Sequence, residues 1–359
     1  MFPALTCGVK WVKVVQVGDI AGVACTLHRG LREAGVDSNL LLLPKQPDPE
    51  LEREPGMDFI RKPWRMLAHA ALAGRVLTRY RGYDIFHAHA LYNIPMGLLR
   101  KLDISNFHGD DLLEVASSES ISGKLMRRAT QQSRKVLVST PDLLEVVEGL
   151  GVEPDKAIFL PNPVDVELFK PRPSRVTLGN DDTIKLFHPT RFQEKKQNRI
   201  LFHAYRYLQD KYPLSLYLVH DDSGTPYVEQ MHALIKRLEL KRVRFLPRME
   251  RKLLVDYYNA SDIVLDQFQL AMGLISFEAM ACGKPVVSAV YRRRKAYPEE
   301  PPVFNAVTVE DIVDCLTFLA ENREKWEEIG RKGRRWVVRY HSLAVVIRRL
   351  QEIYRQVLL

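Results

Sequence analysis

Two segments of this 359-residue sequence carry residue types that could bind a phosphorylated ligand. The first is a glycine turn, Gly18–Gly22, which follows the apolar run Val12–Val17 and precedes an amphipathic pattern. A strand, a glycine turn and a helix N-terminus together present backbone N–H groups that bind phosphate. The turn lacks the spacing of a dinucleotide-binding loop, and a plain tight connection between a strand and a helix explains it equally well.

The second segment is Gly273–Val287, with the sequence GLISFEAMACGKPVV. Its pattern predicts a helix that carries Glu278 and small residues for close packing, followed by a buried strand that opens at Lys284 and Pro285. A carboxylate on such a helix could accept hydrogen bonds from both hydroxyl groups of a ribose. An ordinary exposed glutamate fits the same residues.

The acidic residues and the cysteines do not form a recognisable metal site. Adjacent carboxylates are more often helix caps or loop residues than ligands of hard metal ions. The cysteines are far apart, which argues against zinc ligation and a disulfide framework and is typical of a reducing cytosol. We therefore expect no metal and no other cofactor. The residues concerned are Asp110-Asp111, Asp181-Asp182, Asp221-Asp222, Cys7, Cys25, Cys282 and Cys315.

Short apolar runs alternate with helical patterns along most of the chain. In the first half we predict strands at Val12–Val17, Asn39–Leu43, Asp84–Ala88, Ile104–Phe107 and Lys135–Ser139. Residues 170–182 are rich in proline, glycine and polar side chains and are predicted to be a linker. The alternation then resumes, with strands predicted at Ile184–His188, Ser215–Val219, Val243–Leu246, Ile263–Leu265 and Pro285–Val287.

Strands that alternate with helices predict parallel sheets with right-handed crossovers. The sequence thus predicts an α/β protein with two Rossmann-like domains, residues 1–169 and 183–338, facing each other across a cleft. Apolar residues between 336 and 359 follow one helical stripe, and we expect residues 339–359 to form a helix that packs back on the first domain. In open parallel sheets, ligands bind at the carboxyl ends of the strands.

The formal net charge of +9 favours anionic partners such as a nucleotide, an acidic lipid surface or a nucleic acid. No nucleic-acid-binding module is recognisable, so we expect no nucleic-acid partner. No apolar run approaches the ~20 residues of a membrane span, and the N-terminus lacks the basic start of a signal peptide. These observations predict a cytoplasmic protein.

Two basic segments are compatible with contact to an anionic surface. A helix is predicted over Pro63–Tyr80. Near its start, Arg61–Arg65 contains a tryptophan flanked by cations and leads into the apolar stretch Met66–Leu77. This combination suits peripheral binding to an anionic membrane. A helix packed on the sheet with solvated ends is the alternative. The second segment, Tyr291–Lys295 (YRRRK), follows a predicted strand and suits either an anionic acceptor or a solvated loop.

Several segments together resemble one protein family. EAMACGKPVV is similar to the signature of the retaining GT-B glycosyltransferases of family four, also called sugar transferase group 1. Four further segments resemble motifs of this family in the same order: DIFHAH at 84–89, FHGDDL at 107–112, LPNPVDVELFKP at 160–171 and HPTRFQEKK at 188–196. The resemblance implies transfer of a sugar from a UDP, GDP or ADP donor, with retention of the anomeric configuration.

The resemblance also implies roles for particular residues. Arg191 and Lys196, with Lys195 as the neighbouring alternative, would bind the donor diphosphate and stabilise the charge that grows there as the glycosidic bond breaks. Such a cation pair makes a divalent ion unnecessary. Glu278 would bind the ribose, and His108 would contact the donor sugar near the reacting carbon. The other donor-binding residues that the resemblance implies are Gly22, Gly273 and Leu274.

Two positions depart from the family pattern. Leu270 stands where the family often has a second glutamate that contacts sugar hydroxyl groups, and Gln197 rather than glycine follows Lys196. Two alternatives therefore stay open. One is a non-catalytic relative that binds a nucleotide sugar, and the other is a different GT-B enzyme, such as an epimerase or a phosphorylase. The identity of the acceptor does not follow from the sequence.

Overall fold

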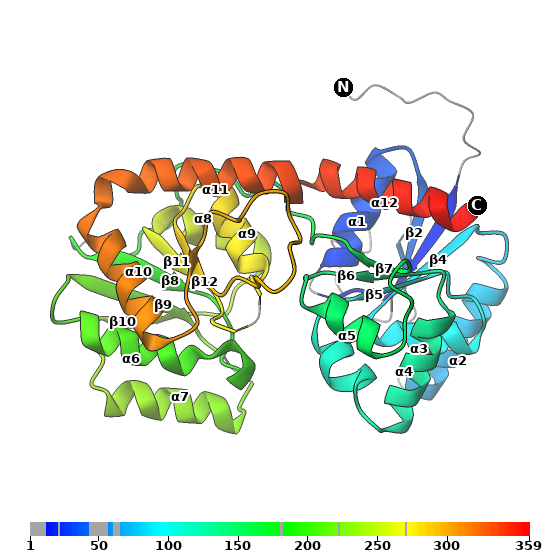
Figure 1. Cartoon of the computed structure of the whole chain (residues 1–359), viewed down its shortest axis with the longest axis horizontal. Coiled ribbons are helices and arrows are strands. Elements are labelled where there is room, and N and C mark those ends of the chain that lie inside the picture. Colours follow the sequence, from blue (N-terminus) through cyan, green and yellow to red (C-terminus); the bar gives the residue numbers. More distant parts are fainter. Residues whose placement is uncertain are drawn as a thin grey trace. The chain divides into compact units, whose positions relative to one another are not determined.

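The computed structural model describes residues 12–20, 22–42, 57–59, 65–179, 182–221, 223–269 and 271–359, with the backbone alone for 57–59 and 65–69. The chain forms two compact units (Figure 1). The first contains the described residues up to Pro163 together with Leu343–Leu359, and the second contains Val164–Ser342. Residues 164–169, expected at the end of the first domain, thus belong to the second unit.

The first unit is built on a parallel sheet. Its described residues form seven strands in the order β3-β2-β1-β4-β5-β6-β7. The strand order reverses between β1 and β4, and open sheets of this kind bind ligands beside such a reversal. The strands are β1 (Lys13–Val17), β2 (Asp37–Leu42), β3 (Met57–Phe59), β4 (Ile85–His89), β5 (Ile104–Phe107), β6 (Lys135–Val138) and β7 (Ala157–Phe159).

Helices cover both faces of this sheet (Figure 1). One face packs against α2 and α3, with Val15, Phe86, Val76 and Met96 in a shared core. On the other face lie α1 and α12, which contact each other. The helices are α1 (Val23–Glu33), α2 (Arg65–Leu77), α3 (Asn93–Leu98), α4 (Ile121–Gln132), α5 (Leu143–Gly149) and α12 (Leu343–Leu358).

The second unit repeats this plan. Its described residues form a six-stranded parallel sheet in the order β10-β9-β8-β11-β12-β13, which reverses between β8 and β11. The strands are β8 (Ile184–His188), β9 (Leu214–Val219), β10 (Val243–Leu246), β11 (Ile263–Leu265), β12 (Val286–Ser288) and β13 (Phe304–Asn305). The helices are α6 (Asn198–Leu208), α7 (Pro226–Arg237), α8 (Leu254–Ala260), α9 (Leu274–Ala281), α10 (Val309–Glu321) and α11 (Trp326–His341).

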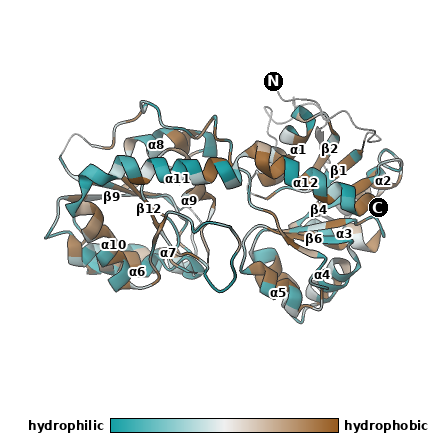
Figure 2. Cartoon of the chain, turned by 45° about the horizontal axis from the view of Figure 1, so that its top comes forward, coloured by the Kyte–Doolittle hydropathy of each residue, from teal (hydrophilic) through white to brown (hydrophobic). Residues whose placement is uncertain are grey.

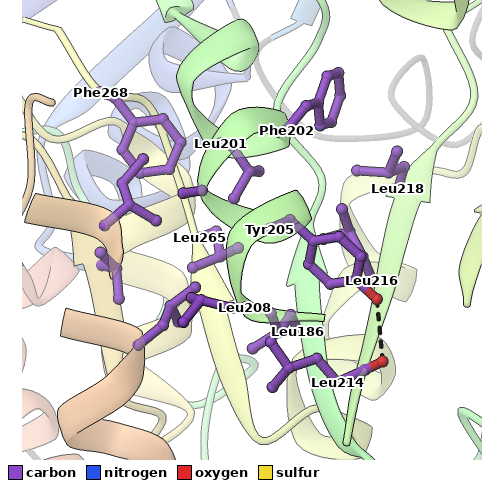
Figure 3. Packing of buried hydrophobic residues seen from close by; sticks show 14 of the residues in the cluster. Leu186, Leu201, Phe202, Tyr205, Leu208, Leu214, Leu216, Leu218, Leu265 and Phe268 are labelled. Atoms are coloured by element: carbon purple, nitrogen blue, oxygen red, sulfur yellow. Dashed lines mark hydrogen bonds between the residues drawn. The ribbon is translucent and has the colours of Figure 1, made fainter. Parts of the chain in front are cut away.

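Each face of the second sheet has its own apolar core. Figure 3 shows the core beneath α6, where Leu201 and Leu208 pack against the strands and the Tyr205 hydroxyl donates to the Leu214 carbonyl at 3.0 Å. On the other face, α8, α9 and α11 pack against Phe187 and Val264. The strands are therefore largely apolar, whereas the helices around them show both apolar and polar residues along their length (Figure 2).

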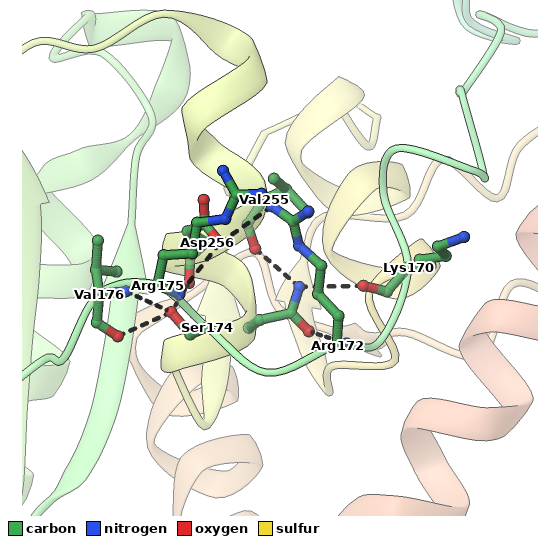
Figure 4. A network of polar contacts seen from close by, with 8 residues as sticks. Lys170, Arg172, Ser174, Arg175, Val176, Val255 and Asp256 are labelled. Carbon is green, nitrogen blue, oxygen red and sulfur yellow. Dashed lines mark hydrogen bonds and ion pairs between the residues drawn. The ribbon is translucent and has the colours of Figure 1, made fainter.

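The first part of the predicted linker, residues 170–176, packs on the second unit (Figure 4). The guanidinium of Arg172 contacts the buried carboxylate of Asp256 at 3.0 Å, and the Arg172 backbone N–H donates to Asn259 at 3.1 Å. Ser174 donates to the Asp256 carbonyl at 2.8 Å. These contacts fix residues 170–176 on α8, so this segment is packed against the second unit.

The C-terminal stripe belongs to two helices where the sequence predicted one. The chain leaves α11 at His341, takes an extended conformation at Ser342 and enters α12 at Leu343. The break is anchored, because the His341 carbonyl accepts from Val164 N–H at 2.8 Å and its ring contacts the Tyr297 hydroxyl at 2.7 Å. The helix that packs on the first unit therefore begins at 343 rather than 339.

Candidate functional site

The loop after β8 carries the predicted diphosphate-binding cations. Arg191 is exposed, three residues beyond the end of β8. The loop is held on both sides of it: Phe192 N–H donates to the Asp221 carboxylate at 3.1 Å, and Gln193 N–H donates to the side chain of Asn198 at 3.1 Å. Asn198 in turn contacts the buried ring of His188 at 2.9 Å. The backbone that presents Arg191 is thus fixed at the reversal of the sheet.

Lys196 joins the same loop to the loop after β11. Its ammonium donates to the side-chain oxygen of Gln267, and its carbonyl accepts from Phe268 N–H at 3.2 Å. The Gln267 carbonyl accepts from Ala289 N–H at 2.8 Å, just beyond β12. Lys195 is half-buried beside it. The loops of three neighbouring strands therefore meet at Lys196.

Gln197 adopts the backbone conformation that favours glycine. Its φ is 56° and its ψ is 35°, in the left-handed region, and it forms the N-cap of α6. A non-glycine residue in this region costs about 1 kcal/mol. The departure from the family pattern at this position thus changes the residue and leaves the glycine-type turn in place.

A buried carboxylate to which the sequence assigned no role, Asp266, organises the start of α9. Asp266 follows β11 and accepts from Gly273 N–H at 2.8 Å, from Ser276 at 2.7 Å and from Thr190 at 3.0 Å. It therefore links the loop after β8 to the N-terminus of α9, where Gly273 and Leu274 lie. The available signal was an acidic residue directly after a strand at the sheet reversal. Leu270 lies outside the described residues.

Glu278 is buried on α9, with an exposed fraction of 1%. One carboxylate oxygen accepts from the guanidinium of Arg251, and the other accepts from the Tyr258 hydroxyl at 3.0 Å. Burial raises the pKa of Glu278, while Arg251 acts in the opposite direction. The reading of Glu278 as an ordinary exposed residue is therefore wrong. Its role in ribose binding stays a prediction.

In the glycine turn of the first unit, a side chain of the turn binds the backbone N–H groups at the start of α1. Gly22 has a φ of 73° and forms the N-cap of α1. The Asp19 carboxylate accepts from the backbone N–H groups of Gly22 at 3.1 Å, Ala24 at 2.7 Å and Cys25 at 3.2 Å. The N–H groups expected to be free for phosphate are thus bound by the chain's own carboxylate. This arrangement agrees with the tight-connection alternative.

His108 follows β5 and lies against a second histidine. Its Nε2 is 3.1 Å from His89 Nδ1, and His89 Nε2 is 3.0 Å from the side-chain oxygen of Gln16. Asp111 accepts from the His108 backbone N–H at 3.1 Å and so orients the loop. His87, which stacks on His89 with ring centroids 4.5 Å apart, contacts the Tyr354 hydroxyl at 2.9 Å. All of these groups belong to the first unit.

These histidines make the stability of the first unit depend on pH. Burial lowers the pKa of His87 to about 3, that of His108 to about 4, and that of His89 well below its usual value. The unfolded chain therefore binds more protons below about pH 6.5, and the stability present above that pH is lost as the pH falls toward 4. Burial raises the pKa of Asp111 to about 6, and its protonation offsets part of the loss.

We expect the free energy of unfolding of the first unit to be about 3 kcal/mol smaller at pH 5.5 than at pH 7.5. Urea unfolding at the two pH values measures this difference. Replacing one histidine, His87→Phe, should shrink the difference by about 1 kcal/mol, because one proton-binding site of the unfolded chain is removed. Equal stability of the native chain at both pH values would show that the three rings titrate normally.

Three further observations concern metal ions, membrane spans and the two basic segments. Among the residues that the structure describes, no group of three His, Cys, Asp or Glu side chains is placed to hold a metal ion. None of the described helices is long and apolar enough to span a membrane. The four cations Arg292–Lys295 are exposed in the loop after β12. Arg61–Trp64 lie outside the described residues, and so does the side chain of Arg65.

Comparison with known families assigns both units. Residues 20–168 match the family described as Glycosyltransferase Family 4, and residues 170–336 match Glycosyl transferases group 1. HepE of Anabaena, solved in complex with UDP, has a TM-score of 0.75 at 18% identity, over 96% of this chain and 100% of that one. Sucrose-phosphate synthase of Thermosynechococcus elongatus has a TM-score of 0.76 at 17% identity, over 96% and 98%.

Curated relatives share part of the sequence. The D-inositol 3-phosphate glycosyltransferase of Kineococcus radiotolerans is 26% identical over 236 residues, 58% of this chain and 54% of that protein. The corresponding protein of Corynebacterium jeikeium is 28% identical over 252 residues, 61% and 60%. The matched segment spans between 35% and 60% of the length of three such relatives.

Two Rossmann-like units, each with a reversal of strand order, give this chain the GT-B fold of these solved structures. The two family matches together reach from residue 20 to residue 336. The chain belongs to the group 1 glycosyltransferases of family four.

Proposed function

We propose that this protein transfers a sugar from a nucleotide-sugar donor to a hydroxyl group of an acceptor, with retention of the anomeric configuration. The observation that carries the proposal is the pair Arg191 and Lys196, presented by one loop at the sheet reversal of the second unit. The related fold of Anabaena HepE, solved with UDP and with UDP-glucose, supports a nucleotide-sugar donor. The family membership supports transfer as the reaction.

Arg191 and Lys196 are proposed to act on the donor diphosphate. As the bond between the sugar carbon and the phosphate oxygen breaks, its electron pair stays on that oxygen, and two fixed cations stabilise the added charge. Gln267 is a suitable partner for Lys196, because its amide oxygen positions the ammonium group without neutralising the positive charge. The Asp266 carboxylate already faces the N-terminus of α9, so the cations must supply most of the attraction for phosphate.

The transfer step needs no protein nucleophile in this scheme. The acceptor oxygen forms the new bond on the face of the sugar that the diphosphate leaves, and its proton passes to the departing phosphate oxygen. Because the cation pair performs the task that a bound metal ion would otherwise perform, we propose that the reaction is metal-independent. We also propose that the protein is cytoplasmic and makes peripheral membrane contact through residues 61–65.

A phosphate-bearing polyol is the proposed acceptor class. The curated relatives are named for transfer to D-inositol 3-phosphate, at 26–32% identity over parts of the chain. The exposed run Arg292–Lys295 lies in the loop after β12 and presents four adjacent cations. Such a run attracts a phosphorylated acceptor by simple charge complementarity.

A thermal-shift screen of UDP, GDP and ADP sugars, run in EDTA, tests the donor and the absence of a metal requirement. A donor at about 100 times its Kd should add about 2.7 kcal/mol of stability, which raises Tm by about 2–4 °C for each kcal/mol. A shift that appears only after Mg²⁺ or Mn²⁺ is added would contradict metal independence. No shift with any of the three sugar classes would contradict the donor assignment.

What happens to the donor separates transfer from the alternatives. A putative UDP-N-acetylglucosamine 2-epimerase of Listeria monocytogenes shares the fold with a TM-score of 0.63 at 13% identity, so the fold alone does not separate epimerases from transferases. An epimerase converts the donor sugar without an acceptor, and a phosphorylase releases a sugar phosphate. A non-catalytic relative binds the donor and leaves it intact.

A further inference from the structure

An unusual row of polar side chains crosses one face of the first sheet. Strands of parallel sheets are buried on both faces and are normally apolar. Yet Gln16 on β1 and both His87 and His89 on β4 have exposed fractions of 0%. Gln16 pairs with His87 in the register of the two strands, so all three side chains lie on the same face, at the reversal of the strand order.

Two of these polar groups, Gln16 and His89, form a line of hydrogen bonds that ends at His108. The Gln16 oxygen lies 3.0 Å from His89 Nε2, and His89 Nδ1 lies 3.1 Å from His108 Nε2. The two imidazole rings are nearly parallel, with centroids 5.4 Å apart. At the far end of the line, His108 Nδ1 is buried and has no hydrogen-bond partner among the described residues.

The direction of every hydrogen bond in this line follows from its first member. A Gln16 side-chain oxygen only accepts, so His89 Nε2 must carry the hydrogen. His89 is neutral in its buried position, so its Nδ1 is bare and accepts. His108 Nε2 therefore donates, and in a neutral His108 the hydrogen on Nε2 leaves Nδ1 with a free lone pair.

We propose that Gln16 and His89 are positioning residues that hold His108 as the Nε2–H tautomer, so that its Nδ1 accepts a hydrogen bond from a hydroxyl group of a bound carbohydrate. The orientation of the Gln16 side-chain amide thus determines, through His89, which nitrogen of His108 carries the hydrogen. A buried lone pair without a partner favours a ligand that brings a donor, and a sugar hydroxyl is such a donor. The choice of a carbohydrate rests on the proposed function, whereas the tautomer does not.

The tautomer is measured directly by two-bond ¹H–¹⁵N correlation spectra of the full chain labelled at histidine nitrogen, at pH 7.5. We expect both His89 and His108 to appear as neutral Nε2–H forms. In Gln16→Leu the fixed acceptor is lost, and both rings should become mixtures of the two neutral tautomers. In His89→Asn the amide oxygen can take over the role of Nδ1, so His108 should keep its Nε2–H form, whereas His89→Leu should release it.

His87→Gln is the matched control. His87 shares the strand, the face and the complete burial of His89, but its contact is with Tyr354 on α12. This variant should disturb packing equally and leave the His108 tautomer unchanged. If Gln16→Leu fails to fold, His89→Leu compared with His89→Asn tests the same line of hydrogen bonds at its second member. A native His108 found as the Nδ1–H form, or as a cation, would overturn the proposal.

Turnover gives a second test, because a purely structural role of Gln16 and His89 would leave kcat unchanged. If donor turnover is established, Gln16→Leu and His89→Leu should lower kcat by about tenfold, the scale of one lost hydrogen bond, and His89→Asn should recover most of it. If no turnover is found, the spectra still decide the tautomer, so the two failures are distinguishable. Equal turnover of His89→Leu and the native chain would contradict a positioning role.

Discussion

Arg191→Ala and Lys196→Ala should each lower kcat by about 10²–10³, the scale of losing one preorganised charge-stabilising group. The two cations are proposed to act where charge grows as the bond to the diphosphate breaks, so their effect is larger in the transition state than in the bound donor. Both side chains rise from one loop that the Asp221, Asn198 and Gln267 contacts fix in place. Saturating kinetics on the purified variants measure kcat separately from donor KM.

Arg206→Ala is the matched control for this experiment. Arg206 is another arginine of the second unit, on α6, where it forms a surface ion pair with Asp210 at 2.9 Å. Such an exposed pair contributes about 0.3–0.5 kcal/mol, so kcat should not change. Native-like kcat in both Arg191→Ala and Lys196→Ala would place the diphosphate elsewhere.

Glu278→Ala should cost stability as well as donor affinity. If the cleft predicted from the sequence held Glu278, the variant would stay folded and chiefly raise KM. The structure changes that expectation, because the carboxylate is buried between Arg251 and Tyr258. Breaking a buried pair costs about 3–5 kcal/mol, and since the Arg251 side chain is one-third exposed, we expect about 2–4 kcal/mol.

Chemical unfolding of Glu278→Ala against Tyr258→Phe separates the two parts of this contact. Tyr258→Phe removes one hydroxyl and leaves the ion pair, so it should cost about 1–2 kcal/mol. If Glu278 also binds ribose, Glu278→Ala should raise donor KM with little change in kcat, because the charge of the ribose does not change in the reaction. A Glu278→Ala protein as stable as the native chain would show that the pair with Arg251 contributes nothing.

Most of the strands could be predicted from the sequence because short, largely apolar runs mark them. The bounds of β5, β8, β10 and β11 agree with the predicted ranges residue for residue. The strands β3, β7 and β13 were missed. They combine a position at a sheet edge with a length of two or three residues, whereas the edge strand β10 is longer and the equally short β11 lies inside its sheet. Ser342 was missed for a related reason, since one apolar stripe continues across the break.

The partners of the site residues could not be predicted, because they are far away in sequence. Glu278 meets Arg251 at a separation of 27 residues, and Lys196 meets Gln267 at 71. Pattern reasoning finds residues within one element and gives no distance between elements. It therefore identified Lys196 and Glu278 through a family motif and left Asp266, which organises the start of α9, without a role.

The binding of a nucleoside diphosphate tests the central claim without any knowledge of the acceptor. Isothermal titration should be run with UDP and with uridine, or with the GDP or ADP pair if the thermal-shift screen selects it. We predict that UDP binds the native chain, that Arg191→Ala and Lys196→Ala each weaken UDP binding by about 10–100-fold, and that uridine binds all three proteins equally. Native-like UDP affinity in both variants, or native binding of uridine as tight as that of UDP, would contradict the account.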